Sequence, residues 1–168
     1  MGTLTVWKFD SANGADDATG VLKDLASRHL ITIQDAATVR WDEGKKKPKT
    51  QQLHNLAGAG ALGGAFWGML FGLIFFVPLL GMAIGAGMGA LTGSMTDVGI
   101  DDAFIRRMRE EIQPGTSALF VLSSGAVVDK VKEAFEGQQM VLVETNLSHD
   151  QEDKLREVFA EETHAPTA

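Results

Sequence analysis

Two rhythms of hydrophobic and polar positions alternate along this chain and predict its strands and helices. Alternating or short continuous apolar stretches, which are typical of strands, occupy residues 4–9, 30–41, 117–122 and 140–145. Apolar positions three or four residues apart, which are typical of amphipathic helices, occupy residues 17–28, 100–112, 126–135 and 148–162. Pro114 and Gly115 end the second of these helices, and residues 163–168 are expected to fray.

The order of these elements predicts the fold class. Strand, helix and strand come first, an apolar insert follows, and helix, strand, helix, strand and helix complete the chain. Two split β-α-β units of this size form a ferredoxin-like α+β sandwich, with four antiparallel strands on one side and helices on the other. We therefore divide the chain into a first β-α-β half (1–49), an inserted hairpin (50–96), a second half (97–162) and a flexible tail (163–168). The insert occupies a loop position, where added length costs little entropy.

The insert is the strongest feature of the sequence. Its 47 residues from Thr50 to Thr96 contain no Asp, Glu, Lys or Arg. Glycine recurs at every fourth position in two ladders, which are Gly60, Gly64, Gly68 and Gly72, then Gly81, Gly85, Gly89 and Gly93. Two apolar arms, residues 56–77 and 79–96, would be helices of about 33 and 27 Å, close to the hydrocarbon thickness of about 30 Å. The pattern predicts an apolar helical hairpin whose tip is Phe75, Phe76, Val77 and Pro78.

The glycine ladders predict how the arms pack. Positions i and i+4 lie on one helix face, so each ladder leaves a groove without side chains, and two such helices can approach closely. Glycine costs about 1 kcal/mol per helical position in water relative to Ala, but in hydrocarbon an unsatisfied backbone group costs more. A second small-residue face could meet a neighbouring subunit, so we expect homo-oligomers. A single crossing at residues 62–80 is the alternative, but it would separate the two halves of the sandwich.

Charge beside the insert predicts its orientation. Basic residues flank both ends, namely Lys45, Lys46, Lys47 and Lys49 before it and Arg106, Arg107 and Arg109 after it. The positive-inside rule then puts both ends, and with them both termini, in the cytoplasm. The tip has no polar residue, so it would stay within the membrane or barely reach the distal interface. The helix at 100–112 could lie on anionic headgroups or cover the sheet, and its amphipathic pattern fits both equally.

Composition narrows the kinds of catalysis and ligand binding that the protein could carry out. The 168 residues include no Cys, which removes thiol nucleophiles, disulfides and Cys-ligated metal sites. A net charge of −7 disfavours a general nucleic-acid binder. The four histidines stand apart from one another, and the GxGxxG match at residues 58–63 lacks a preceding strand and a following acid. No nucleophile-base pair, metal set or phosphate loop emerges, so we expect no enzyme, no catalytic residue, no metal and no cofactor.

Three stretches resemble a known family. They are the start TLTVWKFD, the insert GAGALGGAFWGMLFGLIFFVPLLGMAIGAGMGALTG, and DVGIDDAFIRRM with PGTSALFVL. In these stretches the sequence resembles an uncharacterised bacterial membrane-associated family of unknown function, DUF1269. The resemblance implies the architecture and membrane association, and it brings no activity and no catalytic residue.

Three functions fit these features. The first is a homo-oligomeric structural or scaffolding protein of the bacterial inner membrane, whose partners are copies of itself and the lipid bilayer. The second is a soluble cytoplasmic particle that buries the hairpins in its interior and holds lipid or another apolar guest. The third is an oligomeric channel, which the absence of charged residues along the insert disfavours. Arm length and flanking charge favour the scaffold.

Overall fold

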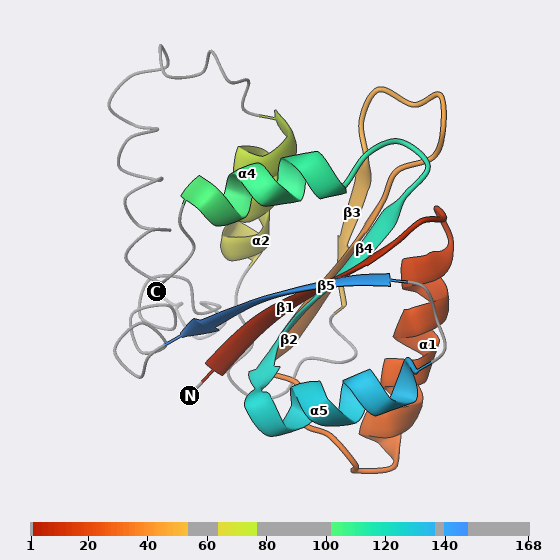
Figure 1. Ribbon diagram of the computed structural model, residues 1–168, viewed down its shortest axis with the longest axis vertical. Coiled ribbons are helices and arrows are strands. Elements are labelled where there is room, and N and C mark those ends of the chain that lie inside the picture. Colours follow the sequence, from red (N-terminus) through yellow and green to blue (C-terminus); the bar gives the residue numbers. More distant parts are fainter. Residues whose placement is uncertain (1, 54–63, 77–101, 137–139, 148–168) are drawn as a thin grey trace, which may run out of the picture.

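The structure, a computed structural model, describes residues 2–53, 64–76, 102–136 and 140–147 of the chain (Figure 1). Its strands are β1 (Gly2–Phe9), β2 (Asp35–Arg40), β3 (Lys49–Gln52), β4 (Ser117–Ser124) and β5 (Met140–Leu147). Its helices are α1 (Gly14–Ser27), α2 (Gly64–Phe71), the π-helix η1 (Gly72–Phe76), α4 (Asp102–Glu111) and α5 (Gly125–Ala134). The predicted second arm (79–96), the helix at 148–162 and the tail lie outside the described residues.

The strands form one antiparallel sheet in the order β3-β2-β4-β1-β5. β1 pairs along its whole length with β4 on one side and β5 on the other, so Val6 stands opposite both Phe120 and Val143. β2 pairs with the edge of β4 that faces away from β1. Because β2 precedes the insert and β4 follows it, the two halves of the chain share one sheet. The predicted α+β class is confirmed, with five described strands where four were predicted.

Helices α1 and α5 cover one face of the sheet (Figure 1). On this side, Trp7 and Phe9 of β1 meet the ring of Phe135, which follows α5, edge to face at 5.2 and 6.2 Å between ring centroids. Leu22 of α1 is fully buried in the same cluster. Val6 points to the opposite face, as the alternation of side chains along a strand requires.

The opposite face carries a second helical layer, formed by α2, η1 and α4 (Figure 1). Their shared core with the sheet includes Val6, Val39 and Phe120 of the strands, Trp67, Leu70 and Phe71 of α2, and Phe104, Met108 and Ile112 at α4. The prediction that helices lie on only one side of the sheet is therefore wrong. The reason is that the described part of the first insert arm covers the sheet face that α1 and α5 leave bare.

Helix α4 uses its apolar ladder to cover this sheet face. Phe104 and Met108 are buried, while Arg106 and Arg107 are exposed on the outer side. Of the two interpretations of this helix, the one in which it covers the sheet is correct in the structure. The helix ends at Glu111, and Gly115 has a φ of +89° in the turn that follows.

The region around β2 differs from the prediction in two ways. Residues 30–34 precede the strand instead of belonging to it, although Ile31 and Ile33 are buried. Their alternating pattern reflects packing beneath α1 and α5. The Gln34 amide donates to the Leu122 carbonyl of β4 at 2.9 Å, and the paired register with β4 begins at Asp35. β3 was missed because it is an edge strand of polar residues that pairs with β2 through the backbone, and its three exposed side chains give no apolar alternation.

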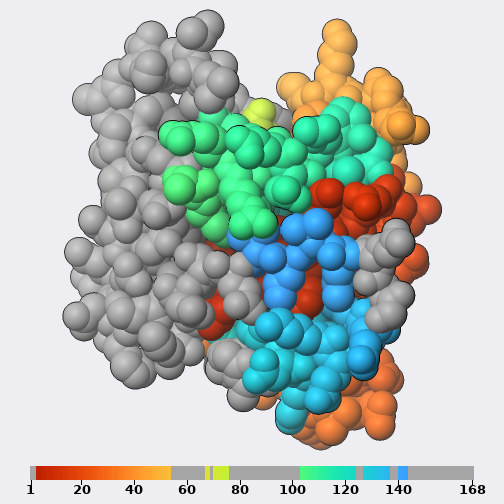
Figure 2. Space-filling model, viewed as in Figure 1, coloured from red at the N-terminus to blue at the C-terminus, as the bar shows by residue number. Residues whose placement is uncertain are grey.

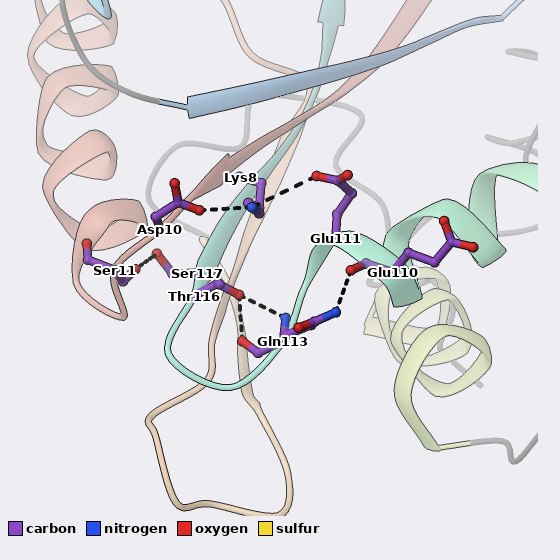
Figure 3. Close-up of polar contacts among 8 residues, drawn as sticks. All are labelled: Lys8, Asp10, Ser11, Glu110, Glu111, Gln113, Thr116 and Ser117. Atoms are coloured by element: carbon purple, nitrogen blue, oxygen red, sulfur yellow. Dashed lines mark hydrogen bonds and ion pairs between the residues drawn. The ribbon is translucent and has the colours of Figure 1, made fainter.

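A buried serine ties the start of α1 to β4. Ser117 Oγ accepts a hydrogen bond from the Ala15 amide at 2.8 Å. It donates one to the Ser11 carbonyl at 2.7 Å (Figure 3). Asn13 stands at the N-cap of α1, but its side chain makes no capping bond. The cap of this helix is thus supplied by a strand 102 residues further along the chain.

Candidate interaction surface

The first arm of the insert forms one helical segment of described residues, α2 continued by η1, which we call the insert helix (64–76). One side of it is buried: Leu70 has no exposed surface, and Phe71 packs edge to face on Phe120 of β4, with 5.1 Å between ring centroids. Trp67 meets the same ring at 6.3 Å. Such pairs add about 0.5–1.5 kcal/mol beyond the burial of apolar surface. This side of the insert helix is therefore part of the core of the domain.

Glycines of the first ladder form a stripe on another side of the insert helix. Gly68 is exposed and Gly72 is half-buried, and a Cβ built on either would meet no described atom within 4 Å. Gly64, the first residue of α2, stands four positions earlier and so falls on the same helix face. We call these three residues the glycine stripe. Other predicted ladder residues lie outside the described residues: Gly60, Gly81, Gly85, Gly89 and Gly93.

Arg109 of α4 holds the end of the insert helix. Its Nε donates a hydrogen bond to the carbonyl of Ile74 at 3.0 Å, and its Nη2 donates to the carbonyl of Leu73. The last carbonyls of a helix have no partner within the helix and carry partial negative charge, so a guanidinium there is favourable. Arg109 was predicted to face the membrane surface. In the structure its guanidinium instead joins the two outer helices of the same chain.

The connection between β2 and β3 forms a basic projection, which we call the lysine hairpin (41–49). Its turn is made by a hydrogen bond from the Lys45 amide to the Asp42 carbonyl at 3.2 Å and by Gly44, whose φ is +83°. Its lysines are all exposed, and none forms an ion pair with a described residue: Lys45, Lys46, Lys47 and Lys49. Figure 2 shows this hairpin, in orange, projecting beyond its neighbours.

An aromatic contact connects the lysine hairpin to the insert helix. The ring of Trp41, at the base of the hairpin, meets the ring of Phe75 edge to face at 5.9 Å between centroids. Trp41 Nε1 also donates to the Lys45 carbonyl at 2.9 Å. Both aromatic side chains are half-buried. The end of the insert helix and the lysines therefore lie at one end of the molecule.

Charged residues near the sheet are paired with one another. The Lys8 ammonium lies 2.9 Å from an Asp10 oxygen and 3.9 Å from a Glu111 oxygen, which links β1 to the end of α4 (Figure 3). The hydrogen bond that Arg40 Nε donates to the Asp42 carboxylate raises the pKa of Arg40 above its ordinary value, with a smaller contribution from Asp16. These contacts are ion pairs on the surface of the folded domain. Among the described residues no group of three metal-ligating side chains comes together.

Some predicted site residues do not lie where the predicted apolar helical hairpin would place them. Phe75 and Phe76, predicted at the tip, belong to η1, and Phe75 packs on the domain through Trp41. Val77 and Pro78 lie outside the described residues. Arg106 and Arg107 are exposed on α4.

Sequence reasoning missed the part that Trp41 plays. A tryptophan at the end of a strand, a few residues before four lysines, is a combination found at membrane-water interfaces, where the indole ring sits at headgroup level. That spacing was available in the sequence. The contact between Trp41 and Phe75 could not be predicted, because 34 positions separate the two residues and no local pattern connects them.

Comparisons with known proteins identify one family. A family model described as protein of unknown function (DUF1269) matches residues 61–160, which include the insert helix, α4, β4, α5 and β5. No curated protein and no solved structure matches the chain. In the part of the chain that the structure describes, no helix combines the length and the apolar character needed to span a bilayer.

Proposed function

The chain belongs to the DUF1269 family, and we propose that it is a membrane-associated scaffold protein that acts by assembling with copies of itself and has no catalytic activity. The observation that carries the proposal is the glycine stripe. A helix whose apolar side is held by its own domain presents, at Gly68 and Gly72, a strip on which a Cβ would meet no described atom. Such strips allow the backbones of two helices to approach closely.

Self-assembly through the glycine stripe is supported by the helix stability that is lost where glycine replaces a better helix former. Glycine in an exposed helix is destabilising by about 0.5–1 kcal/mol relative to Ala. Neither Gly68 nor Gly72 has a positive φ, and neither is held there by a close neighbour among the described residues. Close packing against a second helix accounts for both glycines. The remaining ladder positions would extend the same contact.

Membrane association is supported by the surface around the lysine hairpin and the end of the insert helix, which lie at one end of the molecule. The lysine hairpin offers four exposed ammonium groups, and Trp41 and Phe75 lie at its base. Clustered lysines near a membrane are attracted to anionic lipids by about 1 kcal/mol each. We propose that this end faces the cytoplasmic leaflet of the bacterial inner membrane and that the charge-free run of 47 residues supplies the lipid contact.

The sheet constrains how the insert could enter lipid. β2 ends before the insert and β4 begins after it, and they are hydrogen-bonded neighbours. A segment between them has to return to the side from which it left, which argues against a single crossing. The proposal is therefore a hairpin or re-entrant segment with both termini in the cytoplasm.

We also propose that the domain is a ferredoxin-like sandwich with additions. Without β3, the strand order is β2-β4-β1-β5, with α1 between the first two strands of the chain and α5 between the last two. This order and the antiparallel pairing are those of two split β-α-β units. β3 and the helical layer of α2, η1 and α4 are the additions.

A second candidate is a water-soluble particle whose subunits bury the insert against one another. It is favoured by one observation, the burial of Trp67, Leu70 and Phe71 on the sheet of the same chain. A helix that already covers a protein surface has less apolar area left for lipid. In this candidate the glycine stripe and the rest of the insert meet neighbouring subunits, and lipid or another apolar guest fills the interior.

The proposal is tested by placing a large side chain in the stripe. Gly68→Leu favours the helix intrinsically and should leave the fold intact, yet it fills the strip and should reduce the mass of the assembly. The matched control is Gly20→Leu in α1, an exposed helical glycine where a Cβ also meets nothing within 4 Å. Masses are measured by light scattering with and without detergent, and secondary structure by circular dichroism.

The outcomes separate the two candidates. Wild-type protein that needs detergent for release from membranes, resists carbonate extraction and loses mass in Gly68→Leu supports the scaffold. A large wild-type particle without detergent that Gly68→Leu disrupts supports the second candidate. A monomer under both conditions, or equal masses for wild type and Gly68→Leu, contradicts assembly through the stripe.

A further inference from the structure

Residues of the α1–β2 connection and of α5 line a cavity. Figure 1 shows these two elements at the end of the molecule opposite the lysine hairpin. Its volume is about 370 Å³, which is at the small end of the range of ligand sites, about 300–1,000 Å³. The lining residues are His29, Leu30, Ile31, Thr32, Gln34, Val127 and Lys130. Nothing in the proposed scaffold function uses this cavity.

The backbone at one wall has an unusual residue. The Leu30 amide donates to the Leu25 carbonyl and the His29 amide to the Ala26 carbonyl, both at 3.0 Å, which is the hydrogen-bond pattern of a Schellman motif at the end of α1. The motif requires a left-handed residue at the position of His29, whose φ is +59°. Glycine is the usual residue there because a side chain is strained in this conformation. His29 therefore lines the cavity in a backbone conformation that glycine adopts with less strain.

The polar lining residues are His29, Thr32, Gln34 and Lys130, and Lys130 supplies a positive charge. Lys130 Nζ donates one hydrogen bond to the Leu30 carbonyl at 2.9 Å, and an ammonium has three donors. His29 adds a second group that can donate to an anion. The lining contains no Asp or Glu, although the chain as a whole carries a net charge of −7. Asp129 neighbours Lys130 along α5 without lining the cavity.

The apolar lining residues are Leu30, Ile31 and Val127. Ile31 and Val127 are buried and form part of the core beneath α1 and α5. Leu30 is 41% exposed, which is unusual for a large hydrophobic side chain in this domain. A small site with a cationic side and an apolar side is suited to a ligand that has both characters.

We propose that this cavity binds a small amphipathic carboxylate, with its carboxylate on Lys130 and His29 and its hydrocarbon part against Leu30, Ile31 and Val127. Charge-assisted hydrogen bonds fix the head, and apolar contact supplies the rest of the affinity. An anion without a hydrocarbon part would contact Lys130 and His29 alone. A hydrocarbon without a charge would contact Leu30, Ile31 and Val127 alone.

Binding is tested on the full-length protein with octanoate, by calorimetry and by the methyl NMR signals of Ile31 and Val127. Octanol and inorganic phosphate are the comparison probes, one neutral and one without hydrocarbon. We expect octanoate to bind and to shift both methyl signals, and both comparison probes to bind at least tenfold more weakly. No binding at about 10 mM octanoate, ten times a millimolar Kd, overturns the proposal, and so does equal binding of octanol.

Variants locate the site. Lys130→Met keeps the length of the side chain without its charge and should weaken octanoate binding about tenfold or more. Lys23→Met, an exposed lysine of α1 outside the cavity, should leave the affinity unchanged. His29→Gly suits the left-handed backbone, so it should raise the melting temperature while weakening octanoate binding. Unchanged affinity in both Lys130→Met and His29→Gly would show that octanoate binds elsewhere and would refute the site.

Discussion

Gly14 and Gly20 both belong to α1, but their surroundings differ. A Cβ at Gly14 would overlap the Cβ and Cγ of Phe9, which is buried against Phe135. At Gly20 the same atom would meet nothing within 4 Å. We therefore expect Gly14→Ala to destabilise the protein by about 1–3 kcal/mol, the usual range for an overpacked core. Gly20→Ala should stabilise it by about 0.5–1 kcal/mol because Ala is the better helix former.

Urea unfolding of both variants checks this pair. They are matched in chemistry and in helix, so their difference isolates the neighbourhood of the added methyl group. Free energies of unfolding that change in the same direction would contradict the packing at the β1–α1 junction.

The cap of α1 shows where residue-level prediction from sequence stops. Asn13 is a residue type strongly preferred at the N-cap, and it does stand at that position. The oxygen that receives the Ala15 amide nevertheless comes from Ser117. No local pattern connects those two positions, because only the pairing of β1 with β4 brings them together.

At the scale of elements, Arg109 is the point where α4 and the insert helix meet through polar groups. Arg109→Met removes both donors to the Leu73 and Ile74 carbonyls and keeps most of the aliphatic side chain. Hydrogen bonds from a charged group contribute about 1.5–3 kcal/mol, and partial exposure reduces this. We expect a loss of about 1–2 kcal/mol in unfolding free energy, with faster amide exchange in η1.

Arg106→Met is the matched control. Arg106 is exposed on the same helix, and surface substitutions of this kind usually change stability by less than about 0.5 kcal/mol. Equal losses in the two variants, or unchanged exchange in η1 of Arg109→Met, would mean that the guanidinium does not hold the insert helix.

Elements with an amphipathic pattern could be predicted from the sequence, and others could not. α1 and α5 repeat apolar residues at helical spacing because each has one buried side. β1, β4 and β5 are apolar on both faces because helices cover both faces of the sheet. The insert helix is apolar on nearly every side except at its glycines, a pattern that fits a protein core and a bilayer alike. Its place on the sheet depends on an uncovered face that only the assembled strands create. The glycine ladder could be predicted as a stripe. That no described atom lies within 4 Å of a Cβ at Gly68 or Gly72 could not be predicted.

At the scale of the whole molecule, charge is distributed unevenly. The lysine hairpin lies at one end, while the other described lysines are dispersed over β1, α1 and α5. We predict that Lys46→Gln/Lys47→Gln weakens binding to vesicles rich in anionic lipid about tenfold or more, because each lysine near such a surface contributes about 1 kcal/mol. Binding to neutral vesicles should not change.

Flotation with the two kinds of vesicle measures this effect. Lys23→Gln/Lys132→Gln removes the same two charges from exposed positions on α1 and α5, so net charge is matched. A similar loss in both double variants would assign binding to overall charge and remove the hairpin from the proposed membrane surface.

The strand order also has a consequence for how the protein is made. β1 is translated first, yet both of its neighbours in the sheet, β4 and β5, are translated after the insert. The ribosome delivers the whole charge-free run in between, at about 5–20 residues per second. For several seconds the nascent chain therefore carries this run before the strand that completes the core exists. A chaperone or a membrane can meet the run during that interval, before the domain is able to bury any of it.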